Sequence, residues 1–199
     1  MTKLVLGAGF NDKTRPAKVD GKIVKEYNLW QSMLNRCFSE KLQTRQPTYK
    51  GCNVSDNFLH YSFFYDWCQK QVGFGKVDDK GRYWQLDKDL LFVDNKTYSE
   101  AACVFVPQEV NKFFTDSGAN RGEYPLGVSF HKRAGKFVAQ CTVNGKLQHL
   151  GYFDTPQEAF AVYKPFKENL CKQLALKWQH EIDHRLFNAM MNWSVKSVL

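Results

Sequence analysis

The sequence contains no apolar run of about 18 residues, so no membrane-spanning helix is expected. Its first residues have neither a long apolar core nor a small-residue cleavage site, and we therefore expect no secretory signal peptide. None of the six cysteines belongs to a Cys-x-x-Cys pair, which argues against a zinc ribbon and predicts reduced thiols in the core. Together these absences predict a cytoplasmic protein that needs no zinc and has no membrane partner.

Acidic residues are in deficit as well. The 199 residues include 28 Lys and Arg against 20 Asp and Glu, which gives a net charge of +8. A basic balance favours contact with phosphate groups. The length allows one or two small domains, and the polar stretch at residues 115–123, which contains two glycines, is the best candidate for a linker between them.

The region after this linker predicts a small sheet backed by a helix. Strand-like runs lie at residues 126–131, 136–143 and 146–153, and the pair Asn144-Gly145 between the last two favours a type I′ hairpin turn. Because side chains alternate along a strand, one face of the middle run carries Phe137, Ala139, Cys141 and Val143, and Gln140 and Thr142 project from the other.

A helix is predicted directly after these strands. Thr155-Pro156-Gln157-Glu158 has the pattern of a helix start, with Thr as the cap, Pro at the first position and Glu at the third. Apolar residues at helical spacing follow and continue almost to the end of the chain. A sheet with one helix behind it leaves its second face free, and in a basic chain we expect that face to meet an acidic partner.

Several residues of this region match a known domain in order and spacing: Gly127-Val128, Lys136-Phe137-x-Ala139, Gly145-Lys146, Leu150-Gly151-Tyr152-Phe153-Asp154-Thr155, Glu158-Ala159 and Tyr163. On these residues the region resembles the plant ethylene-response-factor (Apetala-type) DNA-binding domain. The resemblance implies a sheet that lies in the major groove of double-stranded DNA. The residues implied to read bases are Ser129, His131, Gln140, Thr142 and His149. The residues expected to contact phosphates beside them are Lys132, Arg133, Lys136 and Lys146.

The residues before the linker predict a separate mixed module. Helical spacing favours helices at 27–37, 57–71 and 107–114, and strand-like runs lie at 83–93 and 102–106. We interpret the polar, basic residues 39–50 as a loop. The matching pieces Trp30-x-x-Met33-Leu34-x-Arg36-Cys37, Tyr49-x-Gly51-Cys52-x-Val54, Leu86-Asp87-Lys88-Asp89, Asn95-Lys96-x-Tyr98-Ser99 and Cys103-x-Phe105-Val106-Pro107 resemble phage proteins of the HNH endonuclease type.

This second resemblance implies a hairpin followed by a helix that together grip one divalent metal. The three signature His, Asn and His positions of that site fall at Asp87, Ala102 and Val110 or Asn111, so the module is degenerate. Asp87 and Asp89 are the candidate catalytic carboxylates. With Asn95 they are also the candidate ligands for Mg²⁺, which prefers hard oxygen donors. The alternative is that the two carboxylates flank a strand and pair with lysines.

A histidine pair near the end of the chain has a zinc-protease spacing, His180-Glu181-Ile182-Asp183-His184. On a continuous helix both histidines would share one face. No His, Asp or Glu follows His184 as a third ligand, so we expect no zinc site here.

The predicted fold class is α+β. A degenerate HNH (ββα-metal-like) module occupies residues 1–114, and residues 124–199 form an Apetala-type domain, a three-stranded antiparallel sheet packed on a helix, with a long C-terminal helix. The two resemblances imply a phage protein in the bacterial host cell that binds double-stranded DNA with sequence preference. They leave open whether it is an enzyme that nicks DNA with Mg²⁺. The alternatives are a nuclease-dead regulator that binds DNA and an inhibitor that binds a host protein.

Overall fold

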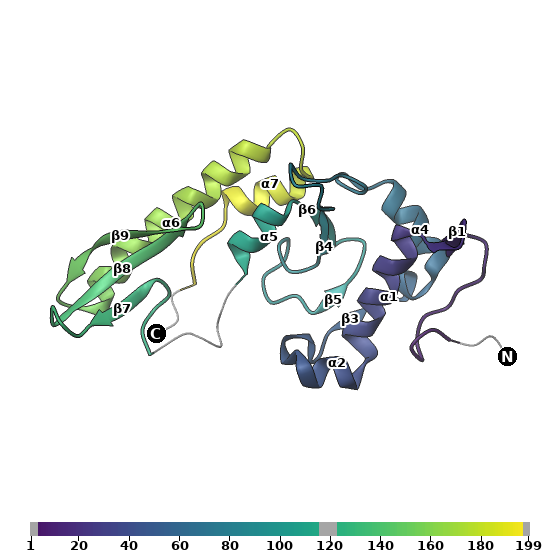
Figure 1. Ribbon diagram of the computed structural model, residues 1–199, viewed down its shortest axis with the longest axis horizontal. Coiled ribbons are helices and arrows are strands. Elements are labelled where there is room, and N and C mark those ends of the chain that lie inside the picture. Colours follow the sequence, from purple (N-terminus) through teal and green to yellow (C-terminus); the bar gives the residue numbers. More distant parts are fainter. Residues whose placement is uncertain (1–3, 116–122, 197–199) are drawn as a thin grey trace. The chain divides into compact units, whose positions relative to one another are not determined.

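The computed structural model describes residues 4–115 and 123–196, and the chain has an α+β fold (Figure 1). It divides into two compact units. Unit 1 comprises Met1–Lys112 with His180–Leu186, and unit 2 comprises Phe113–Gln179 with Phe187–Leu199. The predicted linker at 115–123 lies mostly outside the described residues. The predicted domains left the whole C-terminal region in the second unit, whereas the structure assigns seven of its residues, His180–Leu186, to the first.

Local contacts explain that assignment. The Lys76 ammonium lies 3.5 Å from the Glu181 carboxylate and donates to the Glu181 carbonyl at 3.3 Å. The Arg185 guanidinium donates to the carbonyl of Ala101 at 3.2 Å. These polar contacts, together with the burial of Ile182, hold His180–Leu186 against the earlier part of the chain.

Unit 1 is built around helices α1 (Lys25–Phe38) and α4 (Tyr61–Gln69). The helical spacing predicted for α1 is confirmed, and the side chains of Trp30, Met33 and Leu34 on its inner face are fully buried or nearly so. The Trp30 indole N–H donates to the carbonyl of Phe58 at 2.7 Å, so the ring is buried without leaving its polar atom unpaired. A two-stranded hairpin, β1 (Lys18–Val19) with β2 (Lys22–Ile23), precedes α1.

The single helix predicted at 57–71 is wrong, because α3 (Asp56–Leu59) and α4 are separated by His60 in an extended conformation. The chain near the N-terminus causes the break. The N–H of Phe10 donates to Leu59 at 2.8 Å, and the N–H of Tyr61 donates to Phe10 at 2.9 Å. These long-range bonds take backbone groups that a continuous helix would pair internally.

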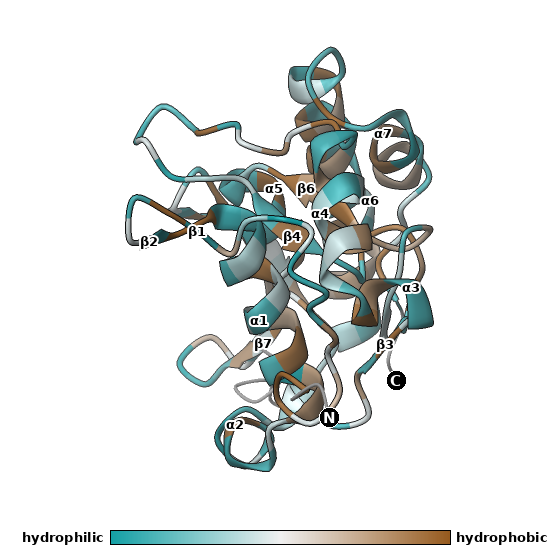
Figure 2. Cartoon of the chain, turned by 90° about the vertical axis from the view of Figure 1, so that its right-hand side faces the viewer, coloured by the Kyte–Doolittle hydropathy of each residue, from teal (hydrophilic) through white to brown (hydrophobic). Residues whose placement is uncertain are grey.

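The loop predicted at 39–50 is also wrong. It contains helix α2 (Glu40–Arg45) and a 3₁₀ turn (Pro47–Tyr49). The Ser39 hydroxyl accepts from the N–H of Leu42 at 3.3 Å and so caps α2. Figure 2 shows that α2 is mostly hydrophilic, whereas β6 (Val104–Val106), the partner of β4 (Gln85–Asp87), is hydrophobic.

Short strands complete unit 1. β3 (Asn53–Val54) pairs with β5 (Thr97–Tyr98) in parallel, and β4 pairs with β6 antiparallel. The predicted strands at 83–93 and 102–106 are therefore both too long. Helix α5 (Gln108–Phe114) follows β6, close to the helix predicted at 107–114. In chain order, β4, β5 and β6 precede α5, and β4 and β6 are the antiparallel pair.

Unit 2 contains the predicted three-stranded antiparallel sheet, β7 (Val128–His131), β8 (Lys136–Val143) and β9 (Lys146–Phe153), in the order β7-β8-β9. Helix α6 (Pro156–Trp178) lies along one face of it (Figure 1). The bounds of β8 and β9 agree with the prediction, and the capping box of Thr155 and Glu158 is present. Buried side chains of the sheet and the helix form the core: Ala139, Cys141, Ala159 and Tyr163, joined by Val195.

Two further features fix the chain path in unit 2. At Gly127, whose φ is 75°, an added Cβ would lie 2.1 Å from the Tyr163 ring, so only glycine fits. The predicted long C-terminal helix is present as α6, but the helical pattern predicted almost to the end of the chain is interrupted, because α6 ends at Trp178 and α7 spans His184–Met191. The Asp183 carboxylate accepts from the N–H of Arg185 at 2.8 Å and starts the new helix.

Within the described ranges, no helix is long and apolar enough to cross a membrane.

Candidate nucleic-acid interface and the loop of residues 87–97

The sheet of unit 2 has one face packed on α6 and one outer face. On the helix side, Val128 pairs with Ala139 and Phe137 pairs with Phe153, and all four contribute to the core. The alternating residues must project from the other side. The cross-strand rows of this outer face are His131 with Lys136, Ser129 with Val138 and Tyr152, Gln140 with His149, and Thr142 with Leu147.

The register therefore brings together all five residues implied to read bases, Ser129, His131, Gln140, Thr142 and His149. They come from three strands and share one surface. Their polar groups are donors and acceptors of the kind that recognise base edges, and Gln140 has the amide that can pair with adenine through two hydrogen bonds.

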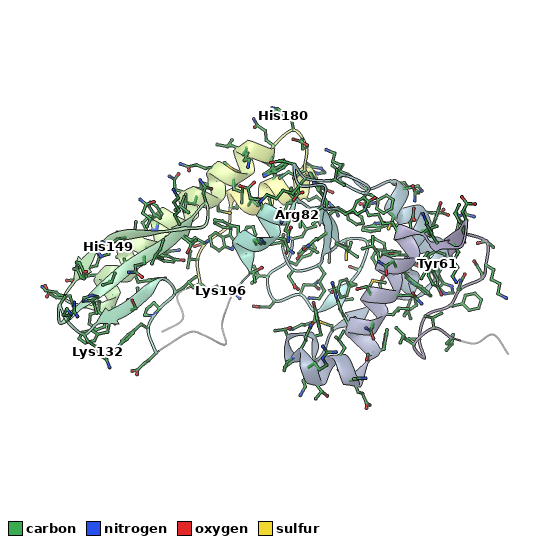
Figure 3. All side chains as sticks on the ribbon, in the orientation of Figure 1. Tyr61, Arg82, Lys132, His149, His180 and Lys196 are labelled. Carbon is green, nitrogen blue, oxygen red and sulfur yellow. The ribbon has the colours of Figure 1, made fainter. Side chains whose placement is uncertain are left out.

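The predicted phosphate contacts lie around this face. Lys132 and Arg133 occupy the turn between β7 and β8, and Figure 3 shows Lys132 at one end of the sheet and His149 on β9. Lys136 projects from the outer face and its ammonium lies 2.5 Å from the Asp154 carboxylate. Lys146 differs from the others, because it pairs with Val143 and so begins β9 on the helix-facing side.

A row of three aromatic rings crosses the outer face. The ring centroid of Tyr152 lies 5.5 Å from that of His131 and 4.6 Å from that of His149. Tyr152 is absent from the residues predicted from the sequence. Strict alternation puts residues 149 and 152 on opposite faces, but a β-bulge between Ala139 and Gln140 leaves Leu150 as an extra residue and returns Tyr152 to the outer face.

The hydrogen bonding of His131 also fixes its tautomer. Its Nδ1 atom accepts from the N–H of Ala134 at 3.1 Å, within the turn that carries Lys132 and Arg133. A neutral imidazole whose Nδ1 accepts carries its proton on Nε2. His131 therefore closes the turn and presents a donor, rather than an acceptor, to whatever contacts its Nε2 edge.

The candidate metal residues of unit 1 lie in the loop that follows β4. Oδ1 of Asp87 accepts from the N–H groups of Asp89 and Leu90 at 2.7 and 3.0 Å, which turns the chain out of the strand. Burial raises the pKa of the Asp87 carboxyl despite these two bonds. Asp87 thus has a structural task as the cap of the loop.

Asn95 closes the other end of this loop. Its side-chain N–H₂ group donates to the carbonyls of Lys88 at 2.7 Å and Thr97 at 2.8 Å, and its Oδ1 accepts from the N–H of Thr97 at 3.2 Å. The Lys88 ammonium returns a bond to the Asn95 carbonyl at 3.2 Å and pairs with the Asp89 carboxylate. Lys88 is only 5% exposed, so a buried cation already lies among these groups.

These side chains do not fit a Mg²⁺ ion as they lie. The amide of Asn95 directs two donors at the loop, its oxygen is taken by Thr97, and the Asp89 carboxylate is neutralised by Lys88. The Lys88 ammonium supplies the positive charge that a metal ion would otherwise bring. Across residues 4–115 and 123–196, no group of three or more His, Cys, Asp or Glu side chains could hold a metal ion. Of the alternative interpretation, in which both carboxylates pair with lysines, the structure shows the pair of Asp89 with Lys88, whereas Asp87 caps the loop.

The other motif positions have ordinary structural surroundings. Ala102 and Val110, which stand at two HNH signature positions, are buried in the core of unit 1. His180 lies in the break between α6 and α7 and His184 begins α7, so the two histidines do not share a helix face as the zinc-protease pattern requires. Comparison with protein-family models, curated proteins and solved structures finds no match to this chain.

Proposed function

We propose that the chain is a sequence-preferring, double-stranded DNA-binding protein that applies the outer face of the β7-β8-β9 sheet to the major groove. One observation carries the proposal. The five polar side chains implied to read bases, from three strands, share one face, and Lys132 and Arg133 lie at its end. Base contacts give sequence preference, and contacts to phosphates give position and most of the affinity.

The resemblance of residues 27–114 to phage proteins of the HNH endonuclease type supports the same partner. The antiparallel pair of β4 and β6, with β5 between them in the chain, precedes α5, as the strand pair and helix implied by that resemblance would. The contacts of Asp87, Asp89 and Asn95 favour the version without nuclease activity, because their side chains hold the loop together. We therefore propose a DNA-binding regulator of the degenerate HNH type.

A salt series on duplex DNA tests the proposal. Binding of the full chain to a random-sequence duplex, followed by fluorescence anisotropy, should weaken steeply as salt rises. Lys132→Ala should lower the slope of log K against log salt by about one unit, since each phosphate contact releases about one counterion. Lys146→Ala is the matched control, because Lys146 begins its strand on the helix-facing side and should change the slope less.

Two outcomes would contradict the proposed function or its nuclease-free form. Absence of duplex binding at low salt would overturn the proposal and favour the alternative of a protein that binds and inhibits a host protein. Plasmid nicking in Mg²⁺ or Mn²⁺ that disappears in Asp87→Ala but survives in Lys132→Ala under conditions of full binding would restore the nuclease assignment.

A further inference from the structure

Tyr152 occupies the middle of the outer sheet face, and the polar residues predicted to read bases surround it. Its cross-strand partner on β8 is Val138, which in turn pairs with Ser129 on β7. Val138 is 1% exposed although it projects from the same face, so neighbouring side chains must cover it, and Tyr152 is the large side chain directly opposite. Tyr152 itself remains 50% exposed. The apolar ring of Tyr152, opposite the buried Val138, is therefore half exposed on the outer face of the sheet.

Two flanking rings restrain the orientation of Tyr152. His131 meets it edge-on at an interplanar angle of 81°, and His149 lies against it at 51°. A tyrosine has few rotatable bonds, and contacts on two sides reduce their freedom further, so little entropy is lost when the ring meets a ligand. The strand bulge at Leu150 is the backbone feature that places Tyr152 in this row.

We propose that Tyr152 is a specificity-determining residue that recognises thymine by packing its ring against the C5 methyl group. This inference rests on the proposed DNA binding and deepens it. In the major groove the thymine methyl is the one apolar group that a base pair offers, and apolar side chains are what contact it. Gln140, paired with His149 on the same face, has the chemistry to recognise adenine. The centre of the face therefore favours A·T pairs.

Replacement of thymine by deoxyuridine tests this inference, since it removes the methyl group and keeps the hydrogen-bonding edge. A preferred duplex is first selected from a random pool with the full-length protein. Each thymine of that duplex is then replaced in turn, and binding is measured by anisotropy. One replacement should weaken the wild-type protein about fourfold, the value expected for one buried methyl group. Tyr152→Phe should keep that difference, and Tyr152→Thr should bind both duplexes equally.

Leu147→Thr is the matched control. Leu147 lies on the same face, 65% exposed and opposite Thr142, so its removal should leave the sensitivity at the Tyr152 position unchanged. Thermal unfolding of each variant checks that the sheet is intact, and the comparison of two duplexes within one variant cancels any loss of folded protein.

The outcomes distinguish failure of the thymine assignment from failure of the proposed DNA binding. If the wild-type protein binds its selected duplex but no deoxyuridine replacement weakens it, or if Tyr152→Thr retains the fourfold difference, the thymine assignment is overturned and the DNA-binding proposal stands. If the wild-type protein binds no duplex, or binds the separated single strands as tightly as the duplex, the proposed function falls and this inference falls with it.

Discussion

Replacement of Asn95 by aspartate distinguishes a structural role from a metal-binding role at the loop of residues 87–97. An aspartate is a better ligand for Mg²⁺ than an asparagine, so a metal site should tolerate or even favour the change. A structural role requires the opposite result. The variant loses two N–H donors, to the carbonyls of Lys88 and Thr97, and turns a carboxylate oxygen toward those carbonyls.

The expected loss follows from these contacts. A hydrogen bond contributes about 0.5–1.5 kcal/mol net, and a buried carbonyl left without its donor costs about 1–3 kcal/mol, so loss of both bonds should lower the free energy of unfolding of unit 1 by about 2–4 kcal/mol. Attraction to the Lys88 ammonium, which donates to the Asn95 carbonyl at 3.2 Å, recovers part of this and keeps the estimate at the lower end.

Urea unfolding followed by tryptophan fluorescence measures the loss. Trp30, Trp67 and Trp84 belong to unit 1, so the transition of that unit dominates the signal. Asn95→Ala, which loses the same donors without adding charge, is the matched variant. Unfolding is compared with Mg²⁺ and with a chelator. An Asn95→Asp protein at least as stable as the wild type, with further stabilisation by Mg²⁺, would refute the structural role and support a metal site.

Three other predictions concern single positions. Asp87→Ala should lower the free energy of unfolding by about 1–3 kcal/mol through loss of its acceptor, whereas Asp87→Asn should be close to neutral. Because burial raises the pKa of this carboxyl, the wild type should gain stability relative to Asp87→Asn as pH falls through that pKa, which urea unfolding at several pH values measures. Gln140→Ala should reduce discrimination at one base pair by about 1–3 kcal/mol in binding to single-substitution duplexes, and an equal loss on every duplex would show that Gln140 only positions the sheet. Gly127→Ala should lower the melting temperature far more than Gly145→Ala, since both have positive φ but only the first meets the Tyr163 ring, and equal shifts would contradict this packing argument.

The parts of the fold that depend on neighbouring residues could be predicted from the sequence. The hairpin of β8 and β9 was predicted with its bounds, because Asn144 and Gly145 adopt φ values of 51° and 77° at no steric cost to glycine and little to asparagine. The start of α6 was predicted for the same reason, since its capping box is made of residues three apart in the sequence.

The parts that depend on distant residues could not be predicted. Only the folded chain brings Phe10 to the junction at His60 and divides the helix there. At the candidate site, alternation correctly grouped Gln140 with Thr142, but the bulge at Leu150 depends on how β9 pairs with β8, so Tyr152 was missed. The signal available in the sequence was Gly151, since glycine inside a strand often marks a bulge.

The assignment of His180–Leu186 to unit 1 has a consequence for the transfer of the three-stranded sheet between proteins. A fragment that begins after the linker carries Ile182 and Arg185 with it but leaves their surroundings, including the Ala101 carbonyl, behind. A fragment that stops at Gln179 loses Trp193 and Val195, which pack on the core of the sheet. Neither fragment therefore keeps all the contacts of its residues. Transfer of the sheet into another protein by recombination must include both units, or must replace the residues that the end of the chain contributes.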